Sequence, residues 1–476
     1  MSREGGSALR RDGRWRGLCL AAWLACVPLL AQAQEILSHG HFEEVALYRP
    51  PGDADAVVLL VSGERGWDAS ASALARKLAA DGALVAGIDG PRLRRSLHAD
   101  GGTCALPAGD LENLSHYLQG YARLPTYRPP LLVGQGEGGA LAYAMLALAD
   151  PGTFAGAISM GFAPRLDLGK RLCRGEGVVF DVPAAGQGDA VVLRPVKKLP
   201  QPWLVLQGDR DTRFDVAAAL AFVGGINGAA LSVLPGVDAE LRPDNGSPRL
   251  RAAVRELARR SAAVPEVTGS VAGLPLIEVP GHAPGDTFAI LLSGDGGWAG
   301  LDKNVAAALV ARGIPVVGFD SLRYFWQPRT PQGLADDLAR TAEHYAVQWQ
   351  LPKVLLIGYS QGADVLPFAV NRLPPATRER VQRTVLMGLG ERAAFEFHLD
   401  NWIGGDHDTD LPILPEAMQL HAADTLCIRG EGEDGSLCPK LAPLHARELA
   451  LPGGHHFDGD YARLAAAILG DTPPSP

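Results

Sequence analysis

Short runs of consecutive apolar residues recur along most of this chain, separated by stretches in which apolar residues return every three to four positions. The clearest runs lie at residues 57–61, 83–88, 130–134 and 203–207. A strand without a polar face must be covered on both sides, as in a parallel sheet flanked by helices. The pattern therefore predicts an α/β fold with mostly parallel sheets.

The same pattern occurs twice in the chain. Residues 56–67 (AVVLLVSGERGW) resemble residues 287–298 (TFAILLSGDGGW) at an offset of 231 positions, and later segment pairs match at offsets of 224, 222 and 217. An offset that shrinks in small steps indicates a duplicated domain with shortened loops. We therefore predict two tandem domains, at residues 34–262 and 263–476, with a Pro- and Gly-rich boundary at 261–275.

The first 33 residues predict a secretory signal peptide. Five arginines precede an uncharged apolar stretch that ends in Ala31-Gln32-Ala33. This order of charge, apolar core and small residues is typical of a cleaved signal, and the apolar core is short for a membrane span. An uncleaved anchor helix is the alternative.

Composition and charge exclude several classes of protein and one class of partner. Hydrophobic residues make up 47% of the chain and charged residues 20%, which excludes a disordered, collagen-like or coiled-coil protein. The net charge of −9 becomes −12 when the five arginines and two acidic residues of segment 1–33 are removed. We therefore expect no nucleic-acid partner and a surface that favours cationic ligands.

Four cysteines remain after removal of the signal, and export favours their oxidation. We expect the disulfides Cys104–Cys173 and Cys427–Cys438, because each pair then stays within one predicted domain. Four unpaired buried thiols are the alternative. No helical zinc spacing is present, although acidic residues cluster near the C-terminus, so we expect neither a metal nor a cofactor.

The segment Gly358-Tyr359-Ser360-Gln361-Gly362 follows an apolar run and precedes a helical stretch. This is the strand–turn–helix setting of a G-x-S-x-G nucleophile elbow, in which glycines let strand and helix approach closely. The sequence therefore predicts Ser360 as a nucleophile at a helix N-terminus.

The partners of a serine nucleophile follow in the order acid, then histidine, in sheet hydrolases. The loop Leu451-Pro452-Gly453-Gly454-His455-His456 offers the base, with His455 as first choice and His456 as second. The loop after residues 425–430 offers three carboxylates, of which we choose Asp434, with Glu431 and Glu433 as alternatives. The acid orients the histidine and stabilises its charged form.

An oxyanion hole needs two backbone N–H donors. We expect one from Gln361 and the other from Asp295 or Gly296, in the Gly-rich loop after residues 287–292. A turn shaped only for packing is the alternative for this loop. Trp298, which ends the loop, and Tyr324, in an aromatic segment after Asp320, are predicted to line a substrate pocket; burial in the core is the alternative for the aromatic segment.

The first domain lacks this chemistry. Gly136 stands at the position of Ser360, and Asp238 stands at the position of His455. We therefore predict a catalytically degenerate domain that either packs against the catalytic one or binds one end of a large substrate.

The second domain resembles the AcvB/VirJ family of virulence proteins from Gram-negative bacteria. The resemblance lies in LIGYSQGADVLP (residues 356–367), DSLRYFW (320–326) and PGGHHFDGDY (452–461), and the two-unit length is similar to the AcvB type. It implies a periplasmic α/β-hydrolase that removes aminoacyl groups, such as lysyl or alanyl, from aminoacyl-phosphatidylglycerol. The family's nucleophile corresponds to Ser360 and its histidine to the pair His455-His456.

The resemblance also implies partners. We expect an aminoacyl-phospholipid substrate, peripheral contact with the membrane surface and possible contacts with a secretion system. Such a substrate carries an ammonium group, for which Asp364 and Asp295 are the candidate partners. A general secreted carboxylesterase and a non-catalytic accessory of type IV secretion are the alternative functions.

Overall fold

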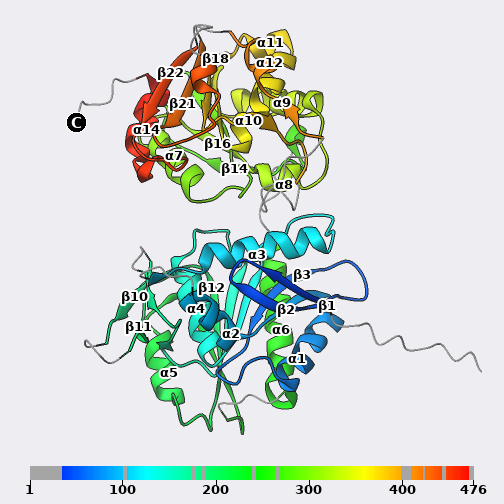
Figure 1. Cartoon of the computed structure of the whole chain (residues 1–476), viewed down its shortest axis with the longest axis vertical. Helices are drawn as coiled ribbons and strands as arrows, with labels where there is room; N and C mark the ends of the chain where they lie inside the picture. Colours follow the sequence, from blue (N-terminus) through cyan, green and yellow to red (C-terminus); the bar gives the residue numbers. More distant parts are fainter. Residues whose placement is uncertain are drawn as a thin grey trace, which may run out of the picture. The chain divides into compact units, whose positions relative to one another are not determined.

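The computed structural model describes residues 35–99, 104–173, 177–183, 188–238, 243–262, 269–397, 409–421, 424–441 and 446–470. The predicted signal peptide lies outside these residues. Two large sheets contain the main strands, one between residues 35 and 234 and one between residues 276 and 451 (Figure 1). Residues 35–262 are called the first half and residues 269–470 the second half, and each half is described by itself.

The first half contains an eight-stranded sheet in the order β1-β2-β4-β3-β6-β7-β12-β13. β2 pairs antiparallel with β1 and with β4, and the other pairings are parallel. The strands are β1 (Glu35–His39), β2 (Phe42–Tyr48), β3 (Ala56–Val61), β4 (Ala83–Ile88), β6 (Leu131–Gln135), β7 (Gly156–Met160), β12 (Lys198–Gly208) and β13 (Asn227–Leu234).

Helices cover both faces of this sheet, which explains why every residue of β3 is buried. Alternate residues of β3 belong to two different hydrophobic clusters: Val57 and Leu59 pack with helices α3 and α4, and Val58 and Leu60 with α1 and α6. The helices are α1 (Ala69–Ala80), α2 (Gly90–Ala99), α3 (Ala108–Tyr121), α4 (Glu137–Leu148), α5 (Val216–Val223) and α6 (Pro243–Ala262).

The second half contains a seven-stranded sheet in the order β14-β16-β15-β17-β18-β21-β22. Only the pairing of β14 with β16 is antiparallel within this sheet. The strands are β14 (Leu276–Val279), β15 (Thr287–Leu292), β16 (Val316–Phe319), β17 (Lys353–Tyr359), β18 (Val381–Met387), β21 (Thr425–Gly430) and β22 (Arg447–Leu451).

Helices also cover both faces of the seven-stranded sheet in the second half. Ile290 and Leu292 of β15 pack with helices α9 and α10, whereas Ala289 and Leu291 pack with α7 and α14. The helices are α7 (Gly300–Val310), α8 (Ser321–Phe325), α9 (Pro331–Gln348), α10 (Gln361–Arg372), α11 (Pro375–Arg378), α12 (Leu414–Ala417), α13 (Cys438–Leu441) and α14 (Tyr461–Leu469), with 3₁₀ turns at η1 (Gly269–Val271) and η5 (Phe457–Gly459).

The strand orders of the two sheets correspond from β2 and β14 onward, so the predicted α/β class with two tandem, mostly parallel sheets is confirmed. Short extra strands complete the halves: β5 (Cys104–Ala105), β8 (Arg165–Leu166), β9 (Arg171–Leu172), β10 (Val179–Asp181), β11 (Val191–Arg194), β19 (Arg392–Ala393) and β20 (Leu411–Pro412).

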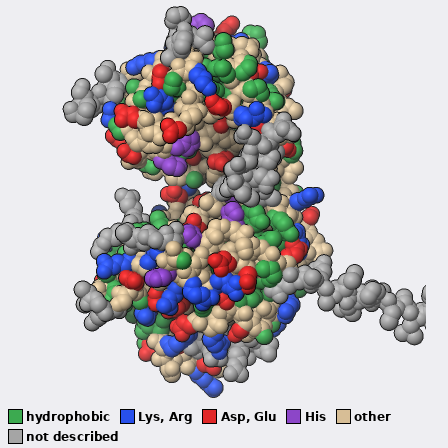
Figure 2. All heavy atoms as spheres, viewed as in Figure 1, with side chains coloured by type: hydrophobic (Ala, Val, Ile, Leu, Met, Phe, Trp, Pro, Cys, Tyr) green, Lys and Arg blue, Asp and Glu red, His purple; other side chains and the backbone are tan. Residues whose placement is uncertain are grey.

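Two surface properties complete the description. Among the described helices, none combines the length and the apolar character that crossing a bilayer requires. On the face drawn in Figure 2, acidic and basic side chains are intermixed rather than gathered by sign.

Candidate active site

Ser360 occupies a strained turn between β17 and α10. Its backbone angles, φ 51° and ψ −121°, lie in a region that residues with a side chain rarely adopt. The flanking glycines explain how the turn fits: a Cβ atom on Gly358 would lie 2.3 Å from the carbonyl oxygen of Gly362, and one on Gly362 would lie 2.4 Å from that of Leu292. This is the geometry of a nucleophile elbow.

Two backbone segments approach this elbow. The N–H of Ser360 donates to the carbonyl of Met387, at the end of β18, over 2.9 Å. A Cβ atom on Gly294 would lie 3.4 Å from Cβ of Ser360, so the Gly-rich loop after β15 lies against the nucleophile. Gln361 is the first residue of α10, where backbone N–H groups have no partner within the helix. Both segments predicted to form an oxyanion hole therefore border Ser360.

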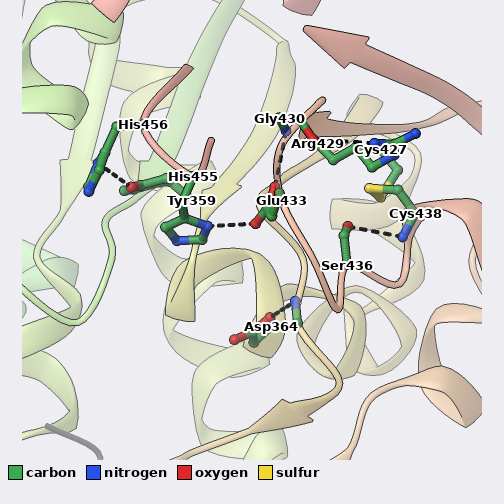
Figure 3. Close-up of polar contacts among 11 residues, drawn as sticks. Tyr359, Asp364, Cys427, Arg429, Gly430, Glu433, Ser436, Cys438, His455 and His456 are labelled. Atoms are coloured by element: carbon green, nitrogen blue, oxygen red, sulfur yellow. Dashed lines mark hydrogen bonds and ion pairs between the residues drawn. A yellow bond between two sulfur atoms is a disulfide. The ribbon is translucent and has the colours of Figure 1, made fainter. Parts of the chain in front are cut away.

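His455 is hydrogen-bonded to Glu433 through Nδ1 and Oε1, 2.6 Å apart (Figure 3). Glu433 also accepts the N–H of Gly430 over 3.0 Å, which folds its side chain back over the end of β21. The Glu433 side chain is only 11% exposed, whereas that of His455 is 39% exposed. A largely buried carboxylate thus holds an imidazole whose other edge is accessible.

This contact corrects the first choice of acid made from the sequence. The carboxylate on His455 belongs to Glu433, an alternative in that analysis, and not to Asp434. Asp434 is the next residue in the turn and is exposed, as is Glu431. Consecutive residues of a turn point in different directions, and the longer glutamate side chain spans the distance back to His455.

The pair shifts both pKa values. The hydrogen bond from Glu433 is the main cause that raises the pKa of His455, and burial opposes it. Burial alone would raise the pKa of Glu433, but the hydrogen bonds from His455 and from the Gly430 N–H outweigh it and lower that pKa. The pair therefore favours a charged imidazolium, the form that a general base takes after accepting a proton.

Gly388 lies next to both His455 and Met387, the residue that binds the N–H of Ser360. It follows Met387, which accepts the Ser360 N–H, and it has a φ of +65°. A Cβ atom on Gly388 would lie 2.7 Å from Cε1 of His455, so only glycine leaves room for the imidazole. Gly388 was not among the residues predicted from the sequence, although the segment Met387-Gly388-Leu389-Gly390 after an apolar run is a visible signal.

His456, the second choice for the base, has another partner. Its Nδ1 lies 3.0 Å from the hydroxyl of Tyr359, and the residue is exposed (Figure 3). The Tyr359 ring lies 5.2 Å from the His455 ring, measured between centroids. Tyr359 therefore contacts both histidines, whose own rings lie 5.9 Å apart between centroids.

Two further carboxylates belong to the site. Oδ1 of Asp364, on α10, accepts the N–H of Gly390 over 2.7 Å, and burial raises its pKa to about 8. Asp295 keeps exposed surface, but the surrounding protein raises its pKa, against backbone N–H groups and His455, which lower it. Within the described residues, no three His, Cys, Asp or Glu side chains come together as a metal site would require.

The two predicted aromatic substrate contacts have packing roles. Tyr324 is fully buried, and its hydroxyl donates to Asp337, so it belongs to the core and does not line a pocket. The indole of Trp298 lies on the backbone of β16, where a Cβ atom on Gly318 would come within 2.6 Å of it. Trp67 has the same relation to Gly87 in the first half, which explains why the tryptophan is repeated.

Both expected disulfides are confirmed. Cys104 is bonded to Cys173, and Cys427 is bonded to Cys438. Cys427 lies within β21 and Cys438 opens α13, so the second disulfide closes the loop that carries Glu433 (Figure 3).

The comparison with protein families matches this half of the chain. Residues 286–473 match the family described as "Bacterial virulence protein (VirJ)", a segment that includes Ser360, Glu433 and His455. The family resemblance inferred from the sequence is thereby confirmed for these residues. No curated protein matches the chain significantly.

Solved structures similar to this chain include α/β serine hydrolases. A serine hydrolase homologue from Coxiella burnetii is 15% identical, covers 47% of this chain and 96% of its own, and has a TM-score of 0.31. A serine hydrolase without a lid from Xanthomonas campestris is 20% identical, with coverages of 49% and 97% and a TM-score of 0.31. An esterase domain from Rhodothermus marinus is 16% identical, with coverages of 45% and 92% and a TM-score of 0.29.

Proposed function

Because residues 286–473 match the family described as "Bacterial virulence protein (VirJ)", we propose that this chain is a periplasmic serine hydrolase. Its proposed substrate is the aminoacyl ester of aminoacyl-phosphatidylglycerol, such as the lysyl or alanyl lipid. The observation that carries the proposal is the nucleophile elbow at Ser360 beside the hydrogen-bonded pair of His455 and Glu433.

The proposed reaction has two steps. Ser360 Oγ attacks the aminoacyl carbonyl while His455 accepts its proton, and His455 then passes that proton to the departing glycerol oxygen of phosphatidylglycerol. Water, activated by the same histidine, then hydrolyses the acyl-enzyme and releases the free amino acid. Glu433 stabilises the imidazolium in both steps. The N–H groups of Gln361 and of the loop at Asp295 and Gly296 supply the oxyanion hole.

The carboxylates near His455 support a substrate that carries an ammonium group. Asp364 binds the N–H of Gly390, two residues after the Gly388 that lies against His455. The charges of Asp364 and Asp295 help to raise the pKa of His455. Burial keeps the carboxyl of Asp364 largely protonated near neutral pH. An arriving ammonium group would favour its ionised form, so binding would displace a proton and form an ion pair.

The test of the proposal uses the mature chain and its Ser360→Ala variant, with lysyl- and alanyl-phosphatidylglycerol in detergent. We expect amino-acid release by the wild type and a loss of about 10⁴-fold or more in the variant, because the nucleophile is removed. If the wild type releases no amino acid but hydrolyses short neutral esters, it is a general carboxylesterase. If neither substrate is hydrolysed, a non-catalytic role in secretion replaces the proposal.

A second variant tests the amino-group preference. Asp364→Asn keeps an oxygen acceptor for the Gly390 N–H but removes the charge. We expect kcat/KM for the lysyl lipid to fall about tenfold while hydrolysis of a neutral ester stays the same, since a part-buried ion pair contributes roughly 1–2 kcal/mol. If Asp364→Asn hydrolyses both substrates at the wild-type rates, Asp364 is not part of the binding site.

Contact with the lipid would be peripheral. The scissile ester lies in the head group, at the level of the membrane surface, so a periplasmic domain reaches it without entering the bilayer. Contacts with a secretion system are proposed only from the sequence resemblance described above.

A further inference from the structure

The first half keeps the backbone of the elbow although it lacks the nucleophile. Gly136 lies between β6 and α4 with φ 53° and ψ −116°, within a few degrees of the angles at Ser360. The steric reason for the flanking glycines is also kept, because a Cβ atom on Gly134 would lie 1.9 Å from the carbonyl oxygen of Gly138. The turn has therefore lost only its reactive side chain.

A guanidinium group stands where that side chain would point. A Cβ atom on Gly136 would lie 3.6 Å from Nη1 of Arg213 and 3.9 Å from its Nη2. Arg213 follows β12, at the end of the sheet where the second half carries its acid loop, and it is paired with Asp211 at 3.7 Å. The position of a nucleophile has become the position of a cation.

Beside this turn the first half has an open cavity of about 600 Å³, which is the size of a small-molecule site. It lies at the carboxyl end of β3 and is bordered by the start of α4, by α2 and by β8. We call it the first-half cavity. Ligands of open α/β sheets bind at this end of the strands.

The first-half cavity carries charges of both signs. Its cationic side chains are Arg94, Arg95 and Arg165, and its anionic ones are Glu64, Glu137 and Asp167. Among these six side chains, one ion pair forms: Arg94 and Asp167 lie 3.2 Å apart. Four groups remain outside this ion pair, two of each sign, so a ligand with a single sign of charge would pair with only two of them.

Glu137 is a half-buried carboxylate of the first-half cavity. It is the first residue of α4, directly after the turn at Gly136. Burial is the main cause that raises its pKa; Glu64 and Asp167 add to it, and Arg165 and Arg94 oppose it. The neighbouring arginines thus offset only part of the cost of ionising Glu137, and a bound ammonium group would offset more of it.

We propose that the first-half cavity binds, without cleaving, a head group that contains both a phosphodiester and an ammonium group. Arginines recognise the phosphodiester, as guanidinium groups do elsewhere, and Glu137 with Glu64 recognises the ammonium. The inference rests on the proposed function, because an aminoacylated phosphatidylglycerol carries both groups. The chain would then have one site that hydrolyses this lipid and a second that retains the protein at surfaces rich in it.

The experiment measures binding in the Ser360→Ala background, so that bound lipid is not consumed. Full-length mature protein is sedimented with phosphatidylcholine vesicles that contain lysyl-phosphatidylglycerol, phosphatidylglycerol or neither. We expect Arg165→Ala to weaken binding to both charged vesicles about fivefold, the usual contribution of one arginine to an anionic head group. Glu137→Gln should weaken binding to the lysyl lipid only, which removes the preference for it over phosphatidylglycerol.

Arg76→Ala is the matched control, since it removes an equally exposed arginine from α1, outside the first-half cavity. Binding that is unchanged in Arg165→Ala and Glu137→Gln, or reduced equally in Arg76→Ala, overturns the inference. Arg165 is exposed, so its replacement should leave the melting temperature unaltered, and a Glu137→Gln variant of normal melting temperature keeps the test informative.

A soluble probe distinguishes the source of the ligand. Titration with glycerophosphoethanolamine, which carries both groups without acyl chains, should show binding that Arg165→Ala weakens if the head group alone is recognised. If the protein binds the vesicles but not glycerophosphoethanolamine, and the two variants weaken vesicle binding as above, the site recognises lipid at a membrane surface. Failure of the hydrolase proposal is recognised separately, because wild-type protein would then release no amino acid while these binding differences persist.

Discussion

His455 and Glu433 set the chemistry at the scale of single residues. A hydrogen bond of 2.6 Å between them keeps the imidazole in one orientation and raises its pKa. The same glutamate is fixed by the N–H of Gly430, so its position does not depend on the substrate. One side chain, that of Glu433, therefore both orients His455 and raises its pKa.

The first prediction concerns Glu433→Gln. A general base acts in its neutral form, so wild-type kcat/KM should fall as the pH drops through the raised pKa of His455. Removing the carboxylate charge lowers that pKa, so the acidic limb of the profile should move to lower pH. The plateau should fall by about 10³–10⁴-fold, as when other triad acids are neutralised. The measurement is kcat/KM on the aminoacyl lipid from roughly pH 5 to pH 9.

Asp434→Asn is the control for this prediction. It neutralises the adjacent, exposed carboxylate and should leave both the plateau and the acidic limb in place. A large loss in Asp434→Asn with normal activity in Glu433→Gln would return the role of acid to the residue first chosen from the sequence.

Most of the site was predictable at this scale because its signals are local. The elbow glycines at 358 and 362 predict the turn at Ser360, since any side chain there would meet backbone. The acid was not predictable, because three carboxylates share one turn and only the path of the chain decides which reaches His455. Tyr324 was misassigned for a related reason: an aromatic residue after a strand looks the same in sequence whether it faces a pocket or Asp337.

At the scale of elements, five loops at the carboxyl ends of β15, β17, β18, β21 and β22 bring the site together. The apolar runs predicted the central strands, because strands covered on both faces need them throughout. The short strands β8, β10 and β11 escaped prediction, since two to four residues carry too little periodicity to be recognised.

The second prediction concerns the Cys427–Cys438 disulfide, which closes an eleven-residue separation around Glu433. Replacing both cysteines by alanine should reduce the free energy of unfolding by about 3 kcal/mol and lower kcat several-fold, because the acid loop loses a covalent tie. Thermal unfolding and hydrolysis rates measure the two effects.

The Cys104–Cys173 disulfide offers the matched comparison. Its cysteines are 69 positions apart, so its removal should cost slightly more stability, about 4 kcal/mol, without changing kcat of the folded protein. A similar loss of kcat in both double variants would show that the Cys427–Cys438 disulfide acts only through general stability.

At the scale of the whole molecule, the excess of acidic residues affects how the protein would encounter the proposed cationic substrate. The chain has a net charge of −9. Attraction over distances beyond a few ångströms is screened by salt, with a Debye length of about 8 Å at physiological ionic strength. Encounter with a positively charged head group should therefore depend on ionic strength.

The third prediction follows from this charge. In neutral detergent micelles, kcat/KM for the lysyl lipid should fall about two- to tenfold between low salt and roughly 0.5 M salt, because screening removes the attraction. Hydrolysis of a neutral ester in the same micelles is the control and should hardly change. Equal salt effects on the two substrates would exclude a contribution from the protein's charge.

The identical turns at Gly136 and Ser360 have a consequence for the balance between stability and activity. Glycine adopts a φ of about +50° without penalty, whereas serine in that conformation costs on the order of 1–2 kcal/mol. Under the proposed function, Ser360 acts from a conformation that costs folding free energy, whereas Gly136 in the first half has no such cost. Ser360→Gly should accordingly produce an inactive protein that melts at a higher temperature than the active one, the trade-off expected of a working catalytic serine.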